Sequence, residues 1–159
     1  MLDLEKNYRF IRKKRDKNFG MLQCTTEYPS SIKKVGLNVI THMKKKFNCH
    51  IGLSDHTGSI FPSIAALSLG ADLIEVHVCT SKKLKGVDVN SSVTFEELKI
   101  ISKARDSIFQ MKQHPVNKNM LSITQKNNKK IFGKGIAIKN DLIKGDKIDI
   151  SNLTLKKPG

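Results

Sequence analysis

The stretch Gly52-Leu53-Ser54-Asp55-His56-Thr57 places a histidine in a small polar cluster at the end of an apolar run. The next apolar run ends in Glu75-Val76-His77. Residues 49–53 and 73–78 have the pattern of short buried strands, and the apolar residues 61–69 between them have the pattern of a short helix. The stretch therefore predicts a strand, a helix and a second strand, with one histidine at the end of each strand.

The two histidines are the first candidates for chemistry in this chain. A crossover through a helix makes the flanking strands parallel, so both histidines are expected at the carboxyl edge of the sheet, where α/β folds bind their ligands. Two imidazoles at one edge can share a metal ion, which makes His56 and His77 candidate metal ligands. Two histidines are only half of a ligand set, and the alternative is that one or both are hydrogen-bonded histidines of the core or of a loop.

The same alternation of strands and helices continues on both sides of this unit. Further strands and helices are expected at 2–14 (helix), 19–24 (strand), 30–47 (helix) and 94–113 (helix). The last of these begins with a capping box, Thr94-Phe95-Glu96-Glu97. Repeats of a strand followed by a helix are typical of an α/β fold with a parallel sheet.

Two loops are expected at the same edge of the sheet. The loop 25–29 carries Tyr28, whose hydroxyl could reach a polar site or whose ring could pack on the strand end. The long loop 80–93 contains Asp88, which could hold a substrate hydroxyl or act as an acid or base. The alternative for Asp88 is an aspartate that only shapes a turn.

The last part of the chain has a different composition. Residues 115–128 are rich in asparagine, lysine and glutamine, which predicts a linker. Residues 131–138 then predict a strand interrupted by glycines, and Lys144-Gly145-Asp146 predicts a tight turn. A second, smaller unit is therefore expected after the linker.

Composition excludes several classes of protein. The 159 residues are 38% hydrophobic and 27% charged, which is ordinary for a globular protein, and no apolar run is long enough to cross a membrane. Residues 1–17 lack the apolar core of a signal peptide. We therefore expect a cytoplasmic protein without a membrane partner.

The net charge of +15 invites a nucleic-acid interpretation, because a basic surface attracts phosphate. The excess charge is nearly all lysine, however, scattered over the whole chain and not interleaved with aromatic residues. Such lysines are better explained as solvated surface charge. No nucleic-acid partner is expected.

Several motifs resemble, in the same order, those of the sialic acid synthase family, which includes N-acetylneuraminate synthase and bacterial relatives that make legionaminic and pseudaminic acids. The motifs are 24–29 (Cys-Thr-Thr-Glu-Tyr-Pro), 52–57, 75–77, 86–88 (Gly-Val-Asp) and the closing segment 129–159. The resemblance extends over nearly the whole chain.

The resemblance implies a fold and a reaction. Residues 1–114 would be the last three strand–helix units of a TIM (β/α)8 barrel, 115–128 a linker, and 129–159 the start of an incomplete antifreeze-protein-like (SAF, β-clip-like) domain. The reaction would condense phosphoenolpyruvate with an N-acylated aminohexose such as N-acetylmannosamine, giving a nonulosonic acid and phosphate. The family requires a divalent ion, Mn²⁺ or Mg²⁺.

The resemblance also implies roles for individual residues. His56 and His77 would bind the metal ion, which would polarise the sugar aldehyde as a Lewis acid. Ser54 would contact phosphoenolpyruvate. Tyr28 and Asp88 would be the catalytic residues of this part of the site and would contact the sugar, Asp88 near its reacting end. A further substrate-binding position holds Thr26 where many members have asparagine, which leaves the sugar open.

A complete barrel of this kind needs ~250 residues, and three strands cannot close one. We therefore expect the chain to be inactive alone and to need a complementary amino-terminal barrel polypeptide, with a homodimer for the complete protein. The alternative is a catalytically inactive fragment that serves as a scaffold or binding module.

Overall fold

The computed structural model describes residues 2–14 and 19–157. The chain divides into two compact units, residues 1–114 and residues 115–159. Each unit is described by itself.

The first unit is built on a parallel sheet of four strands in the order β1-β2-β3-β4. The strands are β1 (Gly20–Cys24), β2 (His50–Asp55), β3 (Leu73–Cys79) and β4 (Ser92–Thr94). In β2, Ser54 lies beside Cys24 of β1 on one side and beside Glu75 of β3 on the other. The predicted parallel α/β arrangement is therefore confirmed.

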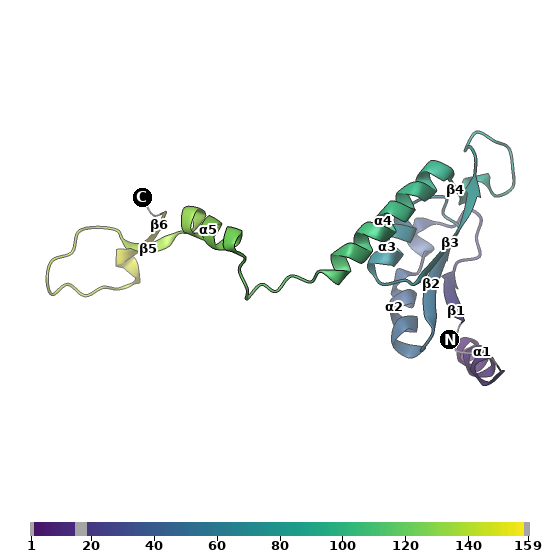
Figure 1. The fold of residues 1–159 in the computed structure, drawn as a ribbon, viewed down its shortest axis with the longest axis horizontal. Coiled ribbons are helices and arrows are strands. Elements are labelled where there is room, and N and C mark those ends of the chain that lie inside the picture. The colour runs from purple at the N-terminus through teal and green to yellow at the C-terminus, as the bar shows by residue number, and fades with distance from the viewer. Residues whose placement is uncertain (1, 15–18, 158–159) are drawn as a thin grey trace. The chain divides into compact units, whose positions relative to one another are not determined.

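Helices cover one face of this sheet. They are α2 (Leu37–Lys46), α3 (Phe61–Ser68) and α4 (Phe95–Gln113), which lie on the same side of the strands in Figure 1. The preceding helix α1 (Leu2–Lys14) lies near the start of β1, and its residues Leu4 and Tyr8 pack against the core. The core forms where α2 and α3 meet β2, with Ile40, Ile51 and Ala66 fully buried. Within the described residues, no helix is both long enough and apolar enough to span a membrane.

Alternation along β2 separates apolar from polar side chains. Ile51 and Leu53 point into the core under the helices. Because successive residues of a strand face opposite sides, Gly52, Ser54 and then His56 lie on the face away from the helices. Of the stretch 52–57, Ser54 and His56 therefore belong to the face of the sheet that the helices do not cover.

The prediction of three strand–helix units was wrong in one respect. The fourth strand, β4, and the short 3₁₀ turn Val89–Ser91 before it lie within the range 80–93, which was predicted to be loop. Strand β3 consequently leads to β4 without an intervening helix. Strand β3 was expected to be buried but is exposed or half-buried along its whole length, and β4 pairs with it only from His77 to Cys79.

The helix predicted over 30–47 is interrupted. A 3₁₀ turn occupies Ile32–Lys34, with the Ser31 side chain at its cap, and α2 begins only at Leu37. Gly36 between them has a φ of +74°, which is incompatible with a continuous right-handed helix. A β-carbon at Gly36 would also lie 2.7 Å from the Gln23 side-chain nitrogen.

Helix α4 follows the prediction closely. The Thr94 hydroxyl accepts a hydrogen bond from the Glu97 N–H at 3.2 Å, and the Glu97 carboxylate accepts one from the Thr94 N–H at 2.7 Å. The Thr94 N–H lowers the pKa of Glu97 below its ordinary value. The predicted capping box is confirmed, as is the amphipathic helix at residues 2–14.

The second unit contains α5 (Ile123–Phe132) and an antiparallel pair of strands, β5 (Gly135–Ile138) and β6 (Leu153–Lys156). The predicted linker to 128 and the predicted strand from 131 were therefore wrong in their boundaries. The missed signal is a second capping box at the start of α5. The Ser122 hydroxyl accepts a hydrogen bond from the Gln125 N–H, and the Gln125 side-chain oxygen accepts one from the Ser122 N–H.

Asp72 ties together three elements of the first unit. One carboxylate oxygen accepts the Ile51 N–H of β2 at 2.9 Å, and both oxygens lie 2.9 Å from the Lys44 ammonium of α2. Partial burial opposes ionisation of Asp72, but these hydrogen bonds outweigh it and lower the pKa of the carboxyl below its ordinary value. Ionised Asp72 therefore stabilises the fold at neutral pH.

The variant Asp72→Asn is expected to lower the free energy of unfolding at neutral pH and to weaken its acid dependence. The contribution of Asp72 is complete above the unfolded pKa, about 3.9, and is lost as the pH falls through the lower folded-state pKa. Urea unfolding at a series of pH values measures it, with exposed Asp106→Asn as the control. An unchanged acid dependence in Asp72→Asn would contradict this assignment.

Candidate functional site

The parallel register brings the two predicted histidines together. Ser54 pairs with Glu75, so His56 and His77, each two residues further on, fall side by side. Their ring centroids are 5.2 Å apart, with the ring planes at 76°. Two imidazoles from neighbouring strands thus converge at the carboxyl edge of the sheet.

The ring of His56 is held in one orientation. Its side chain is buried, and Nδ1 lies 3.0 Å from the carbonyl oxygen of Thr25 in the loop after β1. A carbonyl oxygen can only accept a hydrogen bond, so this contact favours the neutral tautomer with the proton on Nδ1 and the lone pair on Nε2. Metal-binding histidines commonly donate their second N–H to a carbonyl in this way.

Tyr28 packs its ring against both histidines. Its centroid is 4.2 Å from that of His56 in a stacked arrangement and 5.7 Å from that of His77 in an edge arrangement. About half of the Tyr28 side chain remains exposed. The tyrosine ring therefore forms a wall of the site. The neighbouring predicted residue, Thr26, is exposed, and no hydrogen bond joins its side chain to either histidine among the described residues.

Asp88 lies at the other side of the pair. Its carboxylate is 3.8 Å from His77 Nδ1, which is an ion-pair distance and longer than a hydrogen bond. The backbone of Asp88 is held firmly, because its carbonyl accepts hydrogen bonds from the Ser91 N–H at 3.0 Å and the Ser92 hydroxyl at 2.7 Å. The half-exposed Asp88 carboxylate therefore stands beside His77 on a fixed turn.

Glu75 is a site residue to which the sequence analysis gave no role. The Ser54 hydroxyl donates a hydrogen bond to the Glu75 carboxylate at 2.7 Å. Glu75 precedes His77 by two residues on the same face of β3, which is the signal that could have revealed it. The hydroxyl of Ser54 has a single proton, and that proton is in the hydrogen bond to Glu75. Ser54 can therefore donate a hydrogen bond to an anionic ligand only if its bond to Glu75 is broken.

Two imidazoles are side chains of a type that metal ions bind, but they do not make a complete ligand set. Within residues 2–14 and 19–157, no group of three or more His, Cys, Asp or Glu side chains is gathered closely enough to hold a metal ion. Nε2 of His56 and the ring of His77 fit one side of a metal's coordination sphere. The remaining ligands would have to come from substrate, water or another polypeptide.

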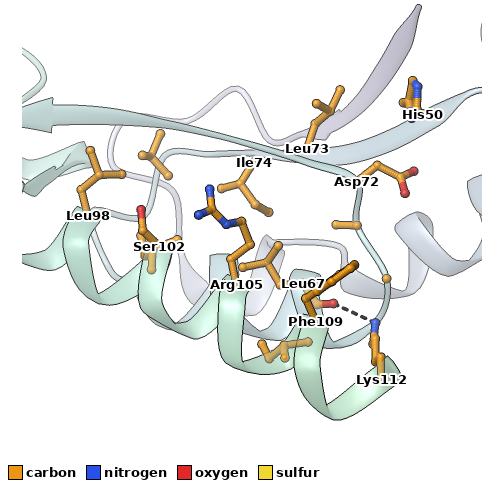
Figure 2. A pocket seen from close by; sticks show the side chains of 15 residues that line it. His50, Leu67, Asp72, Leu73, Ile74, Leu98, Ser102, Arg105, Phe109 and Lys112 are labelled. Carbon is orange, nitrogen blue, oxygen red and sulfur yellow. Dashed lines mark hydrogen bonds between the residues drawn. The ribbon is translucent and has the colours of Figure 1, made fainter. Parts of the chain in front are cut away.

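A separate hollow of about 720 Å³ lies between β3 and α4 (Figure 2). Asp72 and Leu73 line it at the beginning of β3, and Arg105, Phe109 and Lys112 project into it from the second half of α4. His56 and His77 are at the opposite ends of the strands and do not line this hollow. It is therefore not the candidate site.

Comparison with known proteins places the chain in a family. The model of the NeuB family matches residues 1–117. The chain belongs to the NeuB family. It is 35% identical over 141 residues to the N,N'-diacetyllegionaminic acid synthase of Campylobacter jejuni and 32% identical over 156 residues to the human N-acetylneuraminate-9-phosphate synthase. The resemblance to the sialic acid synthase family is thereby confirmed.

Solved structures of similar proteins agree with this assignment. The N-acetylneuraminic acid synthetase of Leptospira borgpetersenii is 26% identical to this chain, and the two superpose with a TM-score of 0.67. The superposition covers 79% of this chain and 43% of the Leptospira protein. The spore coat polysaccharide biosynthesis protein SpsE of Bacillus subtilis shares its fold, with a TM-score of 0.64 over 98% of the chain at 22% identity. The alignment with the Campylobacter jejuni synthase includes 89% of this chain but only 42% of that synthase. The alignment with the human synthase includes 98% of this chain but only 43% of that synthase.

The contact with Thr25 predicts the tautomer of His56 in this NeuB-family chain. In mildly alkaline solution, where free imidazole is neutral, His56 should carry its proton on Nδ1. Nitrogen-15 NMR of histidine-labelled protein distinguishes the two ring nitrogens, and exposed His42 provides the comparison within the same molecule. A proton found mainly on Nε2 of His56 would show that the Thr25 contact does not orient this ring.

Proposed function

We propose that this chain is part of a nonulosonic acid synthase, which condenses phosphoenolpyruvate with an N-acylated aminohexose such as N-acetylmannosamine and releases phosphate. The observation that carries the proposal is the convergence of His56, His77 and Tyr28 at the carboxyl edge of a parallel sheet, in a NeuB-family chain. The names of its relatives, synthases of legionaminic and neuraminic acids, support this class of reaction.

In this proposal the first unit is a section of a (β/α)8 barrel. A barrel section has parallel strands, helices on its outer face, and an inner face that holds the site at the carboxyl ends. Two observations support this: α2, α3 and α4 lie on one side of the sheet in Figure 1, and alternation along β2 puts Ser54 and His56 on the face opposite to Ile51 and Leu53. Residues 129–159 would begin the antifreeze-like SAF domain.

A divalent ion, Mn²⁺ or Mg²⁺, would be held by His56 and His77 and would supply Lewis acidity at the sugar aldehyde. The chain's own residues prepare this position. The Thr25 carbonyl favours the neutral tautomer of His56 whose lone pair is on Nε2, and the ring of Tyr28 stacks on that of His56. The Asp88 carboxylate stands 3.8 Å from Nδ1 of His77, beyond hydrogen-bond distance.

The substrates would contact the remaining residues of the uncovered face. The Ser54 hydroxyl would donate a hydrogen bond to phosphoenolpyruvate. To do so, it would give up its present hydrogen bond to the Glu75 carboxylate. Tyr28, with its half-exposed ring, and Asp88, with its half-exposed carboxylate, would contact the sugar, and Asp88 could transfer a proton there. Thr26 would lie on the substrate side of the same loop.

The proposal includes a partner that completes the barrel. Within the described residues, β1 and β4 are edge strands of the sheet, and unpaired edges and an uncovered face are surfaces that another polypeptide can pair with and cover. An amino-terminal barrel polypeptide would fill this role, and the completed protein would form a homodimer. The alternative function is a binding or scaffold module, favoured by the incomplete set of metal ligands.

The metal assignment predicts that the purified chain binds Mn²⁺ through both histidines. His56→Ala and His77→Ala should each weaken binding by more than about tenfold, because even changes in the outer shell of a metal site cost that much. Isothermal titration calorimetry measures the affinity, and His42→Ala, a change on the exposed side of α2, is the matched control. Equal affinity in all four proteins would refute the histidine pair as the metal site.

The synthase assignment predicts complementation. The chain mixed with the amino-terminal barrel half of a curated relative should form a nonulosonic acid from phosphoenolpyruvate and N-acetylmannosamine in the presence of Mn²⁺, whereas either half alone should not. The same mixture with His77→Ala should be inactive. Turnover by the isolated chain would contradict the need for a partner, and an assembled, Mn²⁺-loaded but inactive mixture would support the binding module instead.

A further inference from the structure

Lys82 joins three backbone segments that surround the candidate site. Its ammonium donates a hydrogen bond to the carbonyl oxygen of Gly58 at 2.8 Å and a short one to the carbonyl oxygen of Ser92. The third side of the ammonium faces the Glu97 carboxylate at 3.9 Å, at the start of α4. Lys82 itself follows β3 by three residues, so one side chain connects the chain segments after β2, after β3 and in β4.

The loops that Lys82 connects are already in close contact. Gly58, two residues after His56, has a φ of +67°, and a β-carbon there would lie 2.2 Å from the carbonyl oxygen of Asn90. The turn that carries Asp88 therefore rests directly on the loop that follows His56. Only glycine at position 58 allows this approach.

The bonds made by Lys82 continue to Asp88. Ser92 presents its carbonyl to Lys82 and its hydroxyl to the carbonyl of Asp88, at 2.7 Å. An ammonium that binds carbonyl oxygens forms charge-assisted hydrogen bonds, which are stronger than neutral ones. The position of the Asp88 carboxylate beside His77 thus depends on a chain of contacts that ends at Lys82.

We propose that Lys82 is a positioning residue for the candidate site, because its ammonium clamps the carbonyls of Gly58 and Ser92 and so holds the Asp88 turn against the histidine pair. A consequence is that Lys82, acting through Asp88, sets the affinity for the divalent ion. This consequence rests on the proposed function. The clamp itself is a property of the described backbone contacts.

The first experiment measures the clamp without a metal. Hydrogen exchange of the amides in 86–92 is compared in the full chain, Lys82→Gln, Lys82→Arg and the control Lys83→Gln, which removes an exposed charge from the same loop. Lys82→Gln should raise exchange by at least about tenfold, because hydrogen bonds to a charged group are lost. Lys82→Arg should keep much of the protection, and Lys83→Gln should keep all of it.

The second experiment separates positioning from a purely structural role. Mn²⁺ affinity is measured in a double-mutant cycle of Lys82→Gln and Asp88→Asn. If Lys82 acts through Asp88, Lys82→Gln weakens Mn²⁺ binding by about tenfold when Asp88 is present and has little further effect in Asp88→Asn. A structural lysine would produce the same loss in both backgrounds, which would overturn the positioning role.

The two experiments fail differently. Unchanged hydrogen exchange in Lys82→Gln would overturn the clamp, whatever the metal data show. Absence of Mn²⁺ binding in the parent chain would overturn the proposed metal site and, with it, the consequence for affinity. Increased exchange confined to 86–92 would in that case still support the clamp.

Discussion

The parallel pairing of β2 with β3 is the constraint on which the rest of the first unit depends. With Ser54 opposite Glu75, the side chains that continue along both strands bring His56 and His77 together. A slip of one residue would turn one of the histidines to the helix-covered face. Gly52 makes this approach possible, since a β-carbon at that position would lie 2.2 Å from the Leu73 carbonyl oxygen.

One face of the sheet carries the apolar core, and the other face carries the side chains of the candidate site. Ile51 and Leu53 of β2 are buried under the helices, where apolar burial supplies the free energy that holds the strands. Ser54 and His56, which alternate with them, carry polar groups on the other face. The candidate site is therefore built from the same strand as the core, and its side chains are positioned by a packed scaffold while the loops supply Tyr28 and Asp88.

The sequence was informative where a signal is local. Alternating and helical patterns located β1, β2, β3 and α4, and the capping box at Thr94 marked the start of a helix correctly. The polar ends of two predicted strands pointed to His56 and His77, and the family resemblance added their expected role as metal ligands. The three-residue strand β4 could not be predicted, because it exists only through its pairing with His77–Cys79. The bond between Ser54 and Glu75 and the clamp by Lys82 likewise depend on residues brought together by the fold, for which the sequence offers no periodic signal.

The central claim, that His56 and His77 act together as ligands of one ion, is tested most directly by pulsed electron paramagnetic resonance of Mn²⁺ bound to the chain. Comparison of protein with natural histidine and with nitrogen-15 histidine identifies the ring nitrogens that coordinate the ion. The account predicts couplings from both histidines, lost one at a time in His56→Ala and His77→Ala. Coupling to a single histidine, or to none, would contradict it.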